Sequence, residues 1–112
     1  LMSKGKARRD FVSITKLCQN INKLIKIKSR NLDRYNFTSG YSFSMSDIAK
    51  IVSEEAKNLF KSNIPIFYSN KYKDKVNSFK VSSKLKIYKN KKILDQELRD
   101  EIKKILLILN EN

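Results

Sequence analysis

The feature that most constrains this fold is a helical spacing of apolar residues, which occurs in three separate segments of the chain. Apolar residues three and four positions apart form one continuous face of a helix, as is typical of a helix that packs against a core. The three segments are residues 11–28, 47–62 and 93–109. A chain of 112 residues is long enough for one small core and not for two. We therefore expect the three helices to share a single core.

The middle segment carries its own start and stop signals. Ser44 or Ser46 is placed to accept hydrogen bonds from the free amides of a first helical turn, and Asp47 favours the positive end of the helix dipole. Asn63 and Pro65 are expected to end the helix. Both ends of this helix are thus predicted from local residues.

The first segment has the cleanest apolar face of the three. Its apolar residues are Phe11, Ile14, Leu17, Cys18, Ile21, Leu24 and Ile25. This pattern predicts a helix that faces the core, with Asp10 as its cap. Cys18 lies within the apolar face, and the chain has no histidine that would activate a thiol. We therefore expect Cys18 to be a small core residue.

An aromatic segment follows the first helix and reads as a hairpin or loop around residues 35–43. Its rings alternate with other residues on both sides of a turn, at Tyr35, Phe37, Tyr41 and Phe43. One interpretation is that these rings close one end of the core. The alternative is that Tyr35 and Tyr41 stack on unpaired bases beside Arg30 and Arg34.

A period of two replaces the helical period later in the chain. Within residues 76–88, apolar residues alternate with lysine and serine, which predicts one or two strands with a basic outer face. We therefore expect an α+β fold: a small, mostly helical domain of three main helices with a short basic β-strand or hairpin. The domain is expected to span residues 10–112, after a flexible basic arm or cloning remnant at residues 1–9.

The positive charge is large and unevenly distributed. The chain has 25 Lys and Arg against 11 Asp and Glu, for a formal net charge of +14. Residues 1–34 carry six Lys and four Arg against two Asp, a net +8, and residues 61–92 carry ten Lys against one Asp, a net +9. Such an excess costs self-repulsion unless a polyanion offsets it, so the sequence predicts nucleic acid as the partner.

The residue types favour binding to phosphates over reading of bases. Lysine outnumbers arginine twenty to five, and lysine is a point charge without the fork with which arginine reads guanine. The function expected is a largely sequence-nonspecific nucleic-acid-binding module, with DNA and RNA left open. Its binding residues are expected to be Arg8, Arg9, Arg30, Arg34, Lys80, Lys84, Lys86, Lys89, Lys91 and Lys92.

Two other classes of function stay open. The chain has no histidine, no paired cysteines and no glycine-rich phosphate loop, so no metal or cofactor is expected and catalysis is not favoured. One enzymatic alternative survives, a small, basic, metal-independent ribonuclease of the toxin kind. The third class is a module for anionic membrane surfaces or protein scaffolds, which ranks last because the face of the first helix suits a core.

The last helix is apolar on more than one side near its end. Either it lies across the whole domain, or it forms a homodimer contact through Leu98, Ile102, Ile105 and Leu109.

There is no run of about 18 apolar residues, so no membrane span is expected. A single cysteine fits an intracellular protein of the cytoplasm, nucleoid or nucleus.

Overall fold

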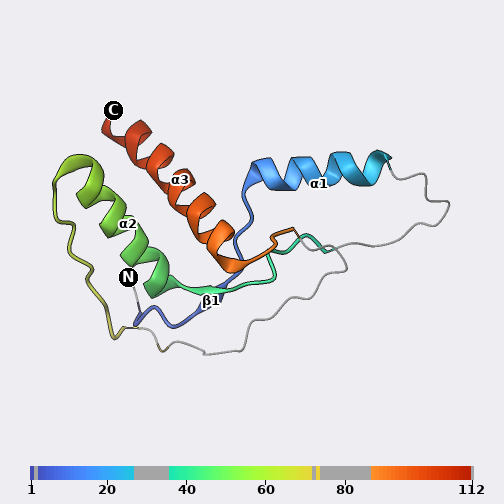
Figure 1. Cartoon of the computed structure of the whole chain (residues 1–112). Helices are drawn as coiled ribbons and strands as arrows, with labels where there is room; N and C mark the ends of the chain where they lie inside the picture. The colour runs from blue at the N-terminus through green and yellow to red at the C-terminus, as the bar shows by residue number, and fades with distance from the viewer. Residues whose placement is uncertain (2, 27–35, 72, 74–86, 112) are drawn as a thin grey trace.

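The fold is small, mostly helical and of the α+β class, as the sequence predicts. The computed structural model describes residues 1, 3–26, 36–71, 73 and 87–111. The elements in chain order are β1 (Arg8–Arg9), α1 (Ile14–Lys26), β2 (Phe43–Ser44), α2 (Met45–Phe60) and α3 (Lys91–Asn110). Figure 1 shows α2 and α3 packed together, the two short strands beside them, and α1 extending to the other side.

Helix α2 begins at Met45, two residues before the predicted start at residue 47, and Ser44, one of the two predicted capping residues, precedes it. Ser44 is its N-cap and forms a capping box with Asp47: the Ser44 hydroxyl accepts from the Asp47 amide at 3.0 Å, and the Asp47 carboxylate accepts from the Ser44 amide at 3.0 Å. The helix ends at Phe60, earlier than predicted, because Lys61 adopts a left-handed conformation with φ of 55°. Its amide donates to the Lys57 carbonyl at 3.0 Å and so closes the last turn.

The capping box gives a stability that depends on pH. Hydrogen bonds from the side chain and the backbone of Ser44 hold the pKa of Asp47 below its ordinary value, so folding favours the carboxylate. The stabilisation is present above the pKa of the unfolded chain, about 3.9, and is lost as the pH falls through the lower pKa of the folded chain.

We expect Asp47→Asn to lower the free energy of unfolding by about 1 kcal/mol at neutral pH, and by less below about pH 4. Urea unfolding at both pH values measures the difference. Asp100→Asn is the matched control, because that carboxylate is half exposed and its ion pair with Lys103 is long, at 3.9 Å. A deficit for Asp47→Asn that stays constant across this pH range would show that the lost charge is not its cause.

The two strands form one antiparallel pair, with Arg8 opposite Ser44 and Arg9 opposite Phe43. The same segment continues along the start of α2, where the amides of Met45 and Ser46 donate to the carbonyls of Ala7 and Gly5, each at 2.9 Å. Amides of a first helical turn have no partner within their own helix, so the N-terminal segment satisfies them. The segment predicted as an arm thus supplies a strand; the division of the chain into arm and domain stays a prediction.

Gly5 makes this close approach feasible. Its φ is +71°, in the left-handed region, and a Cβ at this position would lie 3.0 Å from the Ser46 amide nitrogen and 3.2 Å from the Ser46 Cα. Side chains other than hydrogen would therefore be strained here and would press on the backbone of α2. The glycine lets the chain run directly against the helix start.

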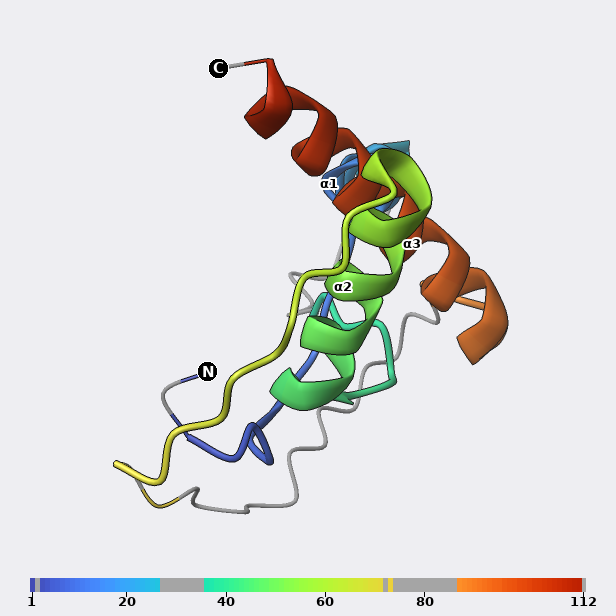
Figure 2. The same ribbon diagram turned by 90° about the vertical axis from the view of Figure 1, so that its left-hand side faces the viewer.

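The core lies where α3, β2 and the segment before α3 meet. Phe43, Tyr88 and Leu94 form its buried cluster, and the ring of Phe11 meets Phe43 edge-on at 6.4 Å between centroids. Partly buried apolar side chains pack around it: Phe11, Val12, Tyr41, Ile48, Ile87 and Leu98. Helices α2 and α3 lie side by side (Figure 2) and each buries apolar residues, Ile51 and Ala56 on α2 and Leu94 and Ile102 on α3.

Helix α1 differs from its prediction. It spans Ile14–Lys26, within the predicted range 11–28. None of its residues is buried, so the predicted core-facing stripe is wrong. Cys18 is exposed, so its predicted role as a core residue is wrong as well. Asp10 does not cap it: its carboxylate instead accepts from the Ser39 amide at 2.9 Å and from the Thr38 hydroxyl. Ser13 takes this role, since its hydroxyl accepts from the Lys16 amide at 3.2 Å.

The aromatic segment is a loop where the structure describes it. Hydroxyls of Thr38 and Ser39 accept from the amides of Gly40 and Tyr41, which forms a turn. Phe43 then pairs with the N-terminal segment, so the described residues 36–43 form no hairpin among themselves. The basic strand predicted within 76–88 lies outside the described residues except for Ile87 and Tyr88, which are not in a strand.

Candidate nucleic-acid interface

Arg8 and Arg9 are positioned by the strand pair. The Arg8 guanidinium donates to the Ser42 hydroxyl at 2.8 Å and to the Ser42 carbonyl, which holds this side chain along the loop before β2. Arg9 is exposed, and its guanidinium donates to the Arg8 carbonyl at 2.9 Å. The strand pair thus fixes the backbone of both residues, and Ser42 holds the Arg8 guanidinium.

One lysine at the start of α3, Lys91, lies near the strand pair, and Lys89 and Lys92 are its neighbours in the chain. Lys89, Lys91 and Lys92 are exposed, and the Lys91 ammonium lies 5.2 Å from the ring centroid of Phe43, a cation–π contact. Phe43 is also the residue opposite Arg9 in the strand pair. The two basic parts of the sequence therefore meet at Phe43. We call Arg8, Arg9, Lys89, Lys91 and Lys92 the basic cluster.

The start of α3 strengthens the positive potential of the basic cluster. Lys91 and Lys92 occupy its first turn, which holds no acidic residue, and the N-terminal end of a helix is itself partly positive. Asn90 caps the helix by accepting from the Ile93 amide at 3.0 Å. Cations at this end are unfavourable unless an anion lies nearby.

The carboxylates of α3 are paired with other cations. Glu97 pairs with Lys16 at 3.3 Å, Glu101 with Lys104 at 2.9 Å, and Asp95 with Arg99 at 3.1 Å. Among the described residues, no ion pair connects a carboxylate to the basic cluster. The charge of the cluster is therefore not neutralised by the terminal helix.

Arg99 is the centre of an ion network that the sequence analysis did not single out. One Nη atom lies 2.8 Å from Glu55 and 2.9 Å from Glu54 of α2, while Nε binds Asp95. Hydrogen bonds to Glu55, Asp95 and Glu54 raise the pKa of Arg99 above its ordinary value. The spacing of Asp95 and Arg99, four residues on a helix, is the one local signal of this network. It joins α2 to α3.

The other predicted site residues divide into two groups. Tyr41 is half-buried and packs against the core cluster, which favours its role in closing the core over base stacking. The others lie outside the described residues: Arg30, Arg34, Tyr35, Lys80, Lys84 and Lys86.

The predicted dimer residues on α3 also lie in different places. Ile102 is buried and Leu98 packs against the core cluster, whereas Ile105 and Leu109 are exposed. Only the latter two are accessible to a second copy in this structure.

A cleft of about 220 Å³ lies between the residues that lead into α1 and the first half of α3. In its wall the Tyr88 hydroxyl donates to Glu97 at 3.0 Å, and the Ser13 hydroxyl donates to the same oxygen at 3.2 Å. Burial is the main cause that raises the pKa of Tyr88, and the Glu97 carboxylate adds to it. Ser13 lies 84 residues before Glu97 in the chain, so the sequence alone does not indicate that the two residues meet.

Comparisons with known proteins assign this chain to no family. No protein-family model matches the chain, and neither a curated protein nor a solved structure matches it significantly.

The described part of the chain holds no group of three or more cysteine or acidic residues that would bind a metal ion, and none of its helices is long and apolar enough to cross a membrane.

Proposed function

We propose that this protein binds nucleic acid through its phosphates and without catalysis, and that the basic cluster is part of the binding surface. One observation carries the proposal: Arg9 and Lys91, from the two basic parts of the sequence, flank the same aromatic residue, Phe43. A formal net charge of +14 supplies the long-range attraction. The predominance of lysine supports contacts with phosphates and little discrimination among bases.

The proposal predicts a steep dependence on salt. If the five residues of the basic cluster each contact a phosphate of a duplex, the logarithm of affinity should fall against the logarithm of salt concentration with a slope of about −4 to −5. A slope steeper than this would indicate phosphate contacts beyond the cluster.

Neutralising two members of the cluster tests the surface directly. We expect Arg9→Gln with Lys91→Gln to weaken binding roughly tenfold or more at about 0.1 M salt, and to make the slope shallower by about 2, because two counterion-releasing contacts are lost. A salt-titrated anisotropy assay with labelled duplex DNA and with RNA measures both quantities.

Lys50→Gln with Lys57→Gln is the matched control. It removes the same charge from exposed positions of α2, where neither ammonium has an ion pair with a described residue. This control should change affinity by less than about twofold, since it alters only the diffuse field. Equal losses in the two double variants would show that net charge alone, and not the cluster, drives binding.

A ribonuclease is the second candidate, and the Glu97 group supports it. The Glu97 carboxylate accepts from the Tyr88 hydroxyl in the cleft and pairs with the Lys16 ammonium, which lines a neighbouring cleft, so a base, an acid and a cation meet at one carboxylate. If this candidate is right, the protein cuts RNA in EDTA and Glu97→Gln abolishes the cutting while the basic cluster still binds. RNA left intact by the unaltered chain would eliminate it.

A further inference from the structure

Helix α1 exposes an apolar stripe that the fold does not use. Ile14, Ile21 and Ile25 are 72%, 40% and 75% exposed, and Cys18 is exposed as well. Their spacing of four, three and four residues places all of them on one face of the helix. The stripe therefore runs along the whole of α1.

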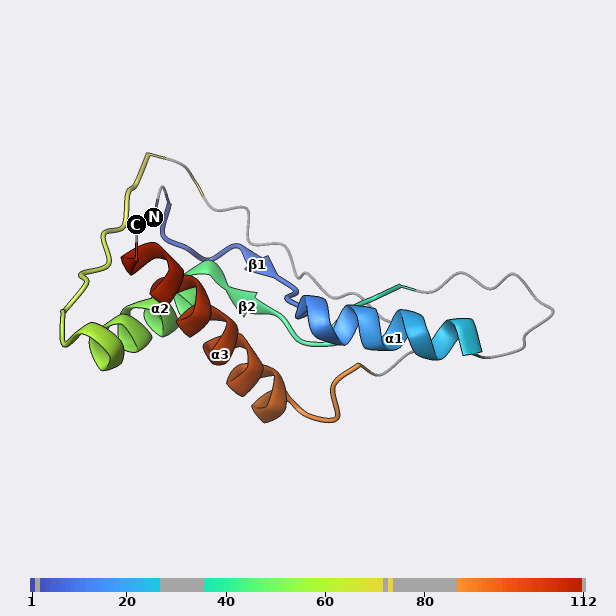
Figure 3. The ribbon, with the colours of Figure 1, turned by 90° about the horizontal axis from the view of Figure 1, so that it is seen from above.

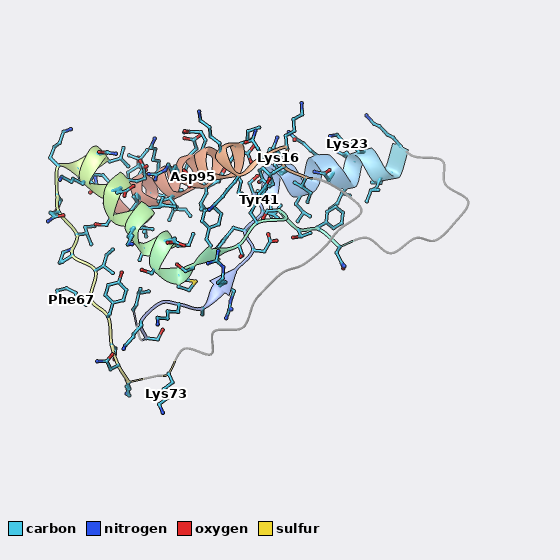
Figure 4. The ribbon with its side chains drawn as sticks, turned by 60° about the horizontal axis from the view of Figure 1, so that its bottom comes forward. Lys16, Lys23, Tyr41, Phe67, Lys73 and Asp95 are labelled. Atoms are coloured by element: carbon cyan, nitrogen blue, oxygen red, sulfur yellow. The ribbon has the colours of Figure 1, made fainter. Side chains whose placement is uncertain are left out.

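The remainder of α1 is basic and holds no carboxylate. Lys16, Lys23 and Lys26 are its only charged side chains. They lie away from the stripe by helical spacing, and Figure 4 shows Lys16 at the end of α1 near α3 and Lys23 farther along the helix. The helix thus combines an apolar face with a cationic one.

The helix is attached to the body at its beginning. Ser13 and Lys16 contact Glu97 of α3, and the Ser13 amide donates to the Tyr88 hydroxyl at 3.3 Å. From there α1 extends away from the α2–α3 pair, as Figures 1 and 3 show. Its far end is therefore distant from the described helices α2 and α3 and can lie on a surface.

A second copy of the chain fits this helix poorly. A coiled-coil partner needs an apolar seam over at least about three heptads, and α1 has 13 residues. Two copies would also bring together helices that carry three lysines each and no acid, in chains of formal net charge +14. Nucleic acid would neutralise the lysines but would leave the apolar stripe in water.

We infer that α1 docks in the plane of an anionic lipid surface. Its apolar stripe would enter the boundary between headgroups and acyl chains, and Lys23 and Lys26 would lie over the lipid phosphates and carboxylates, while Lys16 keeps its ion pair with Glu97. Such a surface complements both faces of the helix. An in-plane helix needs no span across the bilayer, and the exposed stripe removes the objection that this face is needed for the core.

The single cysteine of the chain provides a reporter within the stripe. We attach an environment-sensitive fluorophore to Cys18 and add vesicles of phosphatidylcholine with or without phosphatidylserine. The emission should shift to the blue and intensify with the anionic vesicles, and change little with phosphatidylcholine alone. An unchanged emission with anionic vesicles overturns the inference.

A matched pair of double variants assigns the binding to α1, with flotation of the unlabelled proteins as the readout. Ile14→Ser with Ile25→Ser should weaken vesicle binding roughly tenfold or more, because the helix loses apolar area that the lipid would bury. Ile105→Ser with Leu109→Ser removes exposed apolar residues from α3 and should change binding less than about twofold. Equal losses in both variants overturn the assignment to α1.

Two further outcomes separate lipid binding by α1 from nucleic-acid binding by the basic cluster, and separate lipid from other partners of α1. The variant Arg9→Gln with Lys91→Gln should retain the Cys18 emission shift with vesicles, even where its nucleic-acid binding is lost. Loss of the emission shift would place lipid binding at the basic cluster and overturn the role of α1. A Cys18 shift that grows with protein concentration without lipid, or appears with duplex DNA and not with vesicles, would identify a second copy or nucleic acid as the occupant.

Discussion

Replacing Leu94 with alanine is expected to lower the free energy of unfolding by about 3 kcal/mol. Leu94 is 2% exposed and belongs to the buried cluster with Phe43 and Tyr88. Its removal opens a cavity at the point where α3 meets the strand pair. Because small domains are marginally stable, at roughly 5–15 kcal/mol, this loss is a large share of the total.

Leu107→Ala is the control for this prediction. It makes the same substitution on the same helix, but Leu107 is 47% exposed, so the change should stay within about 0.5 kcal/mol. Urea unfolding followed by circular dichroism measures both variants. Similar losses at the two positions would show that burial at Leu94 is not the cause, because alanine itself favours the helix more than leucine does.

Helix α2 could be predicted from sequence because its boundaries depend on nearby residues. The Ser44–Asp47 capping box needs only residues three positions apart, and both residues could be assigned to the helix start from the sequence. The helix begins at Met45 and ends at Phe60, each two residues before the predicted bound. Its end follows from the left-handed conformation of Lys61, which a lysine side chain does not indicate in a sequence.

Helix α1 shows where periodicity stops being informative. The spacing from Ile14 to Ile25 correctly predicts a helix with one apolar face. It carries no information on what covers that face, because burial depends on the rest of the fold. The same spacing of apolar residues is compatible with a stripe that faces a core, a lipid surface or water.

The strand pair was missed for a different reason. Strands of two residues are too short for an alternating pattern. The segment also satisfies the free amides of Met45 and Ser46, with carbonyls of Ala7 and Gly5 that lie 38 and 41 residues earlier in the chain. Such a contact becomes visible only in three dimensions.

The binding residues of the candidate interface stay a prediction. Charge in the sequence selects Arg8, Arg9, Lys89, Lys91 and Lys92, but it does not indicate that Arg9 lies opposite Phe43 or that Lys91 lies over its ring. Both contacts join residues far apart in the chain, so neither could be predicted from local patterns.

Replacing Arg99 with methionine is expected to lower the free energy of unfolding by about 2–3 kcal/mol. Glu55 is 3% exposed, and the guanidinium is the partner of one of its carboxylate oxygens, at 2.8 Å. The other oxygen has no hydrogen bond among the described residues and lies 3.5 Å from the Lys103 ammonium. Without Arg99 a buried charge keeps only this longer ion pair, and methionine preserves most of the apolar stem.

A double-mutant cycle separates this cost from general damage to α3. Adding Glu55→Gln to Arg99→Met should restore part of the lost stability, with a coupling of about 1–2 kcal/mol. The reason is that Glu55→Gln removes the negative charge that Arg99→Met leaves without its main partner. Lys104→Met is the control: its pair with Glu101 is exposed, so the change should stay below about 0.5 kcal/mol. If the double variant is as unstable as the sum of the single ones, Arg99 stabilises the helix pair by packing, and the buried carboxylate is neutralised by some other group.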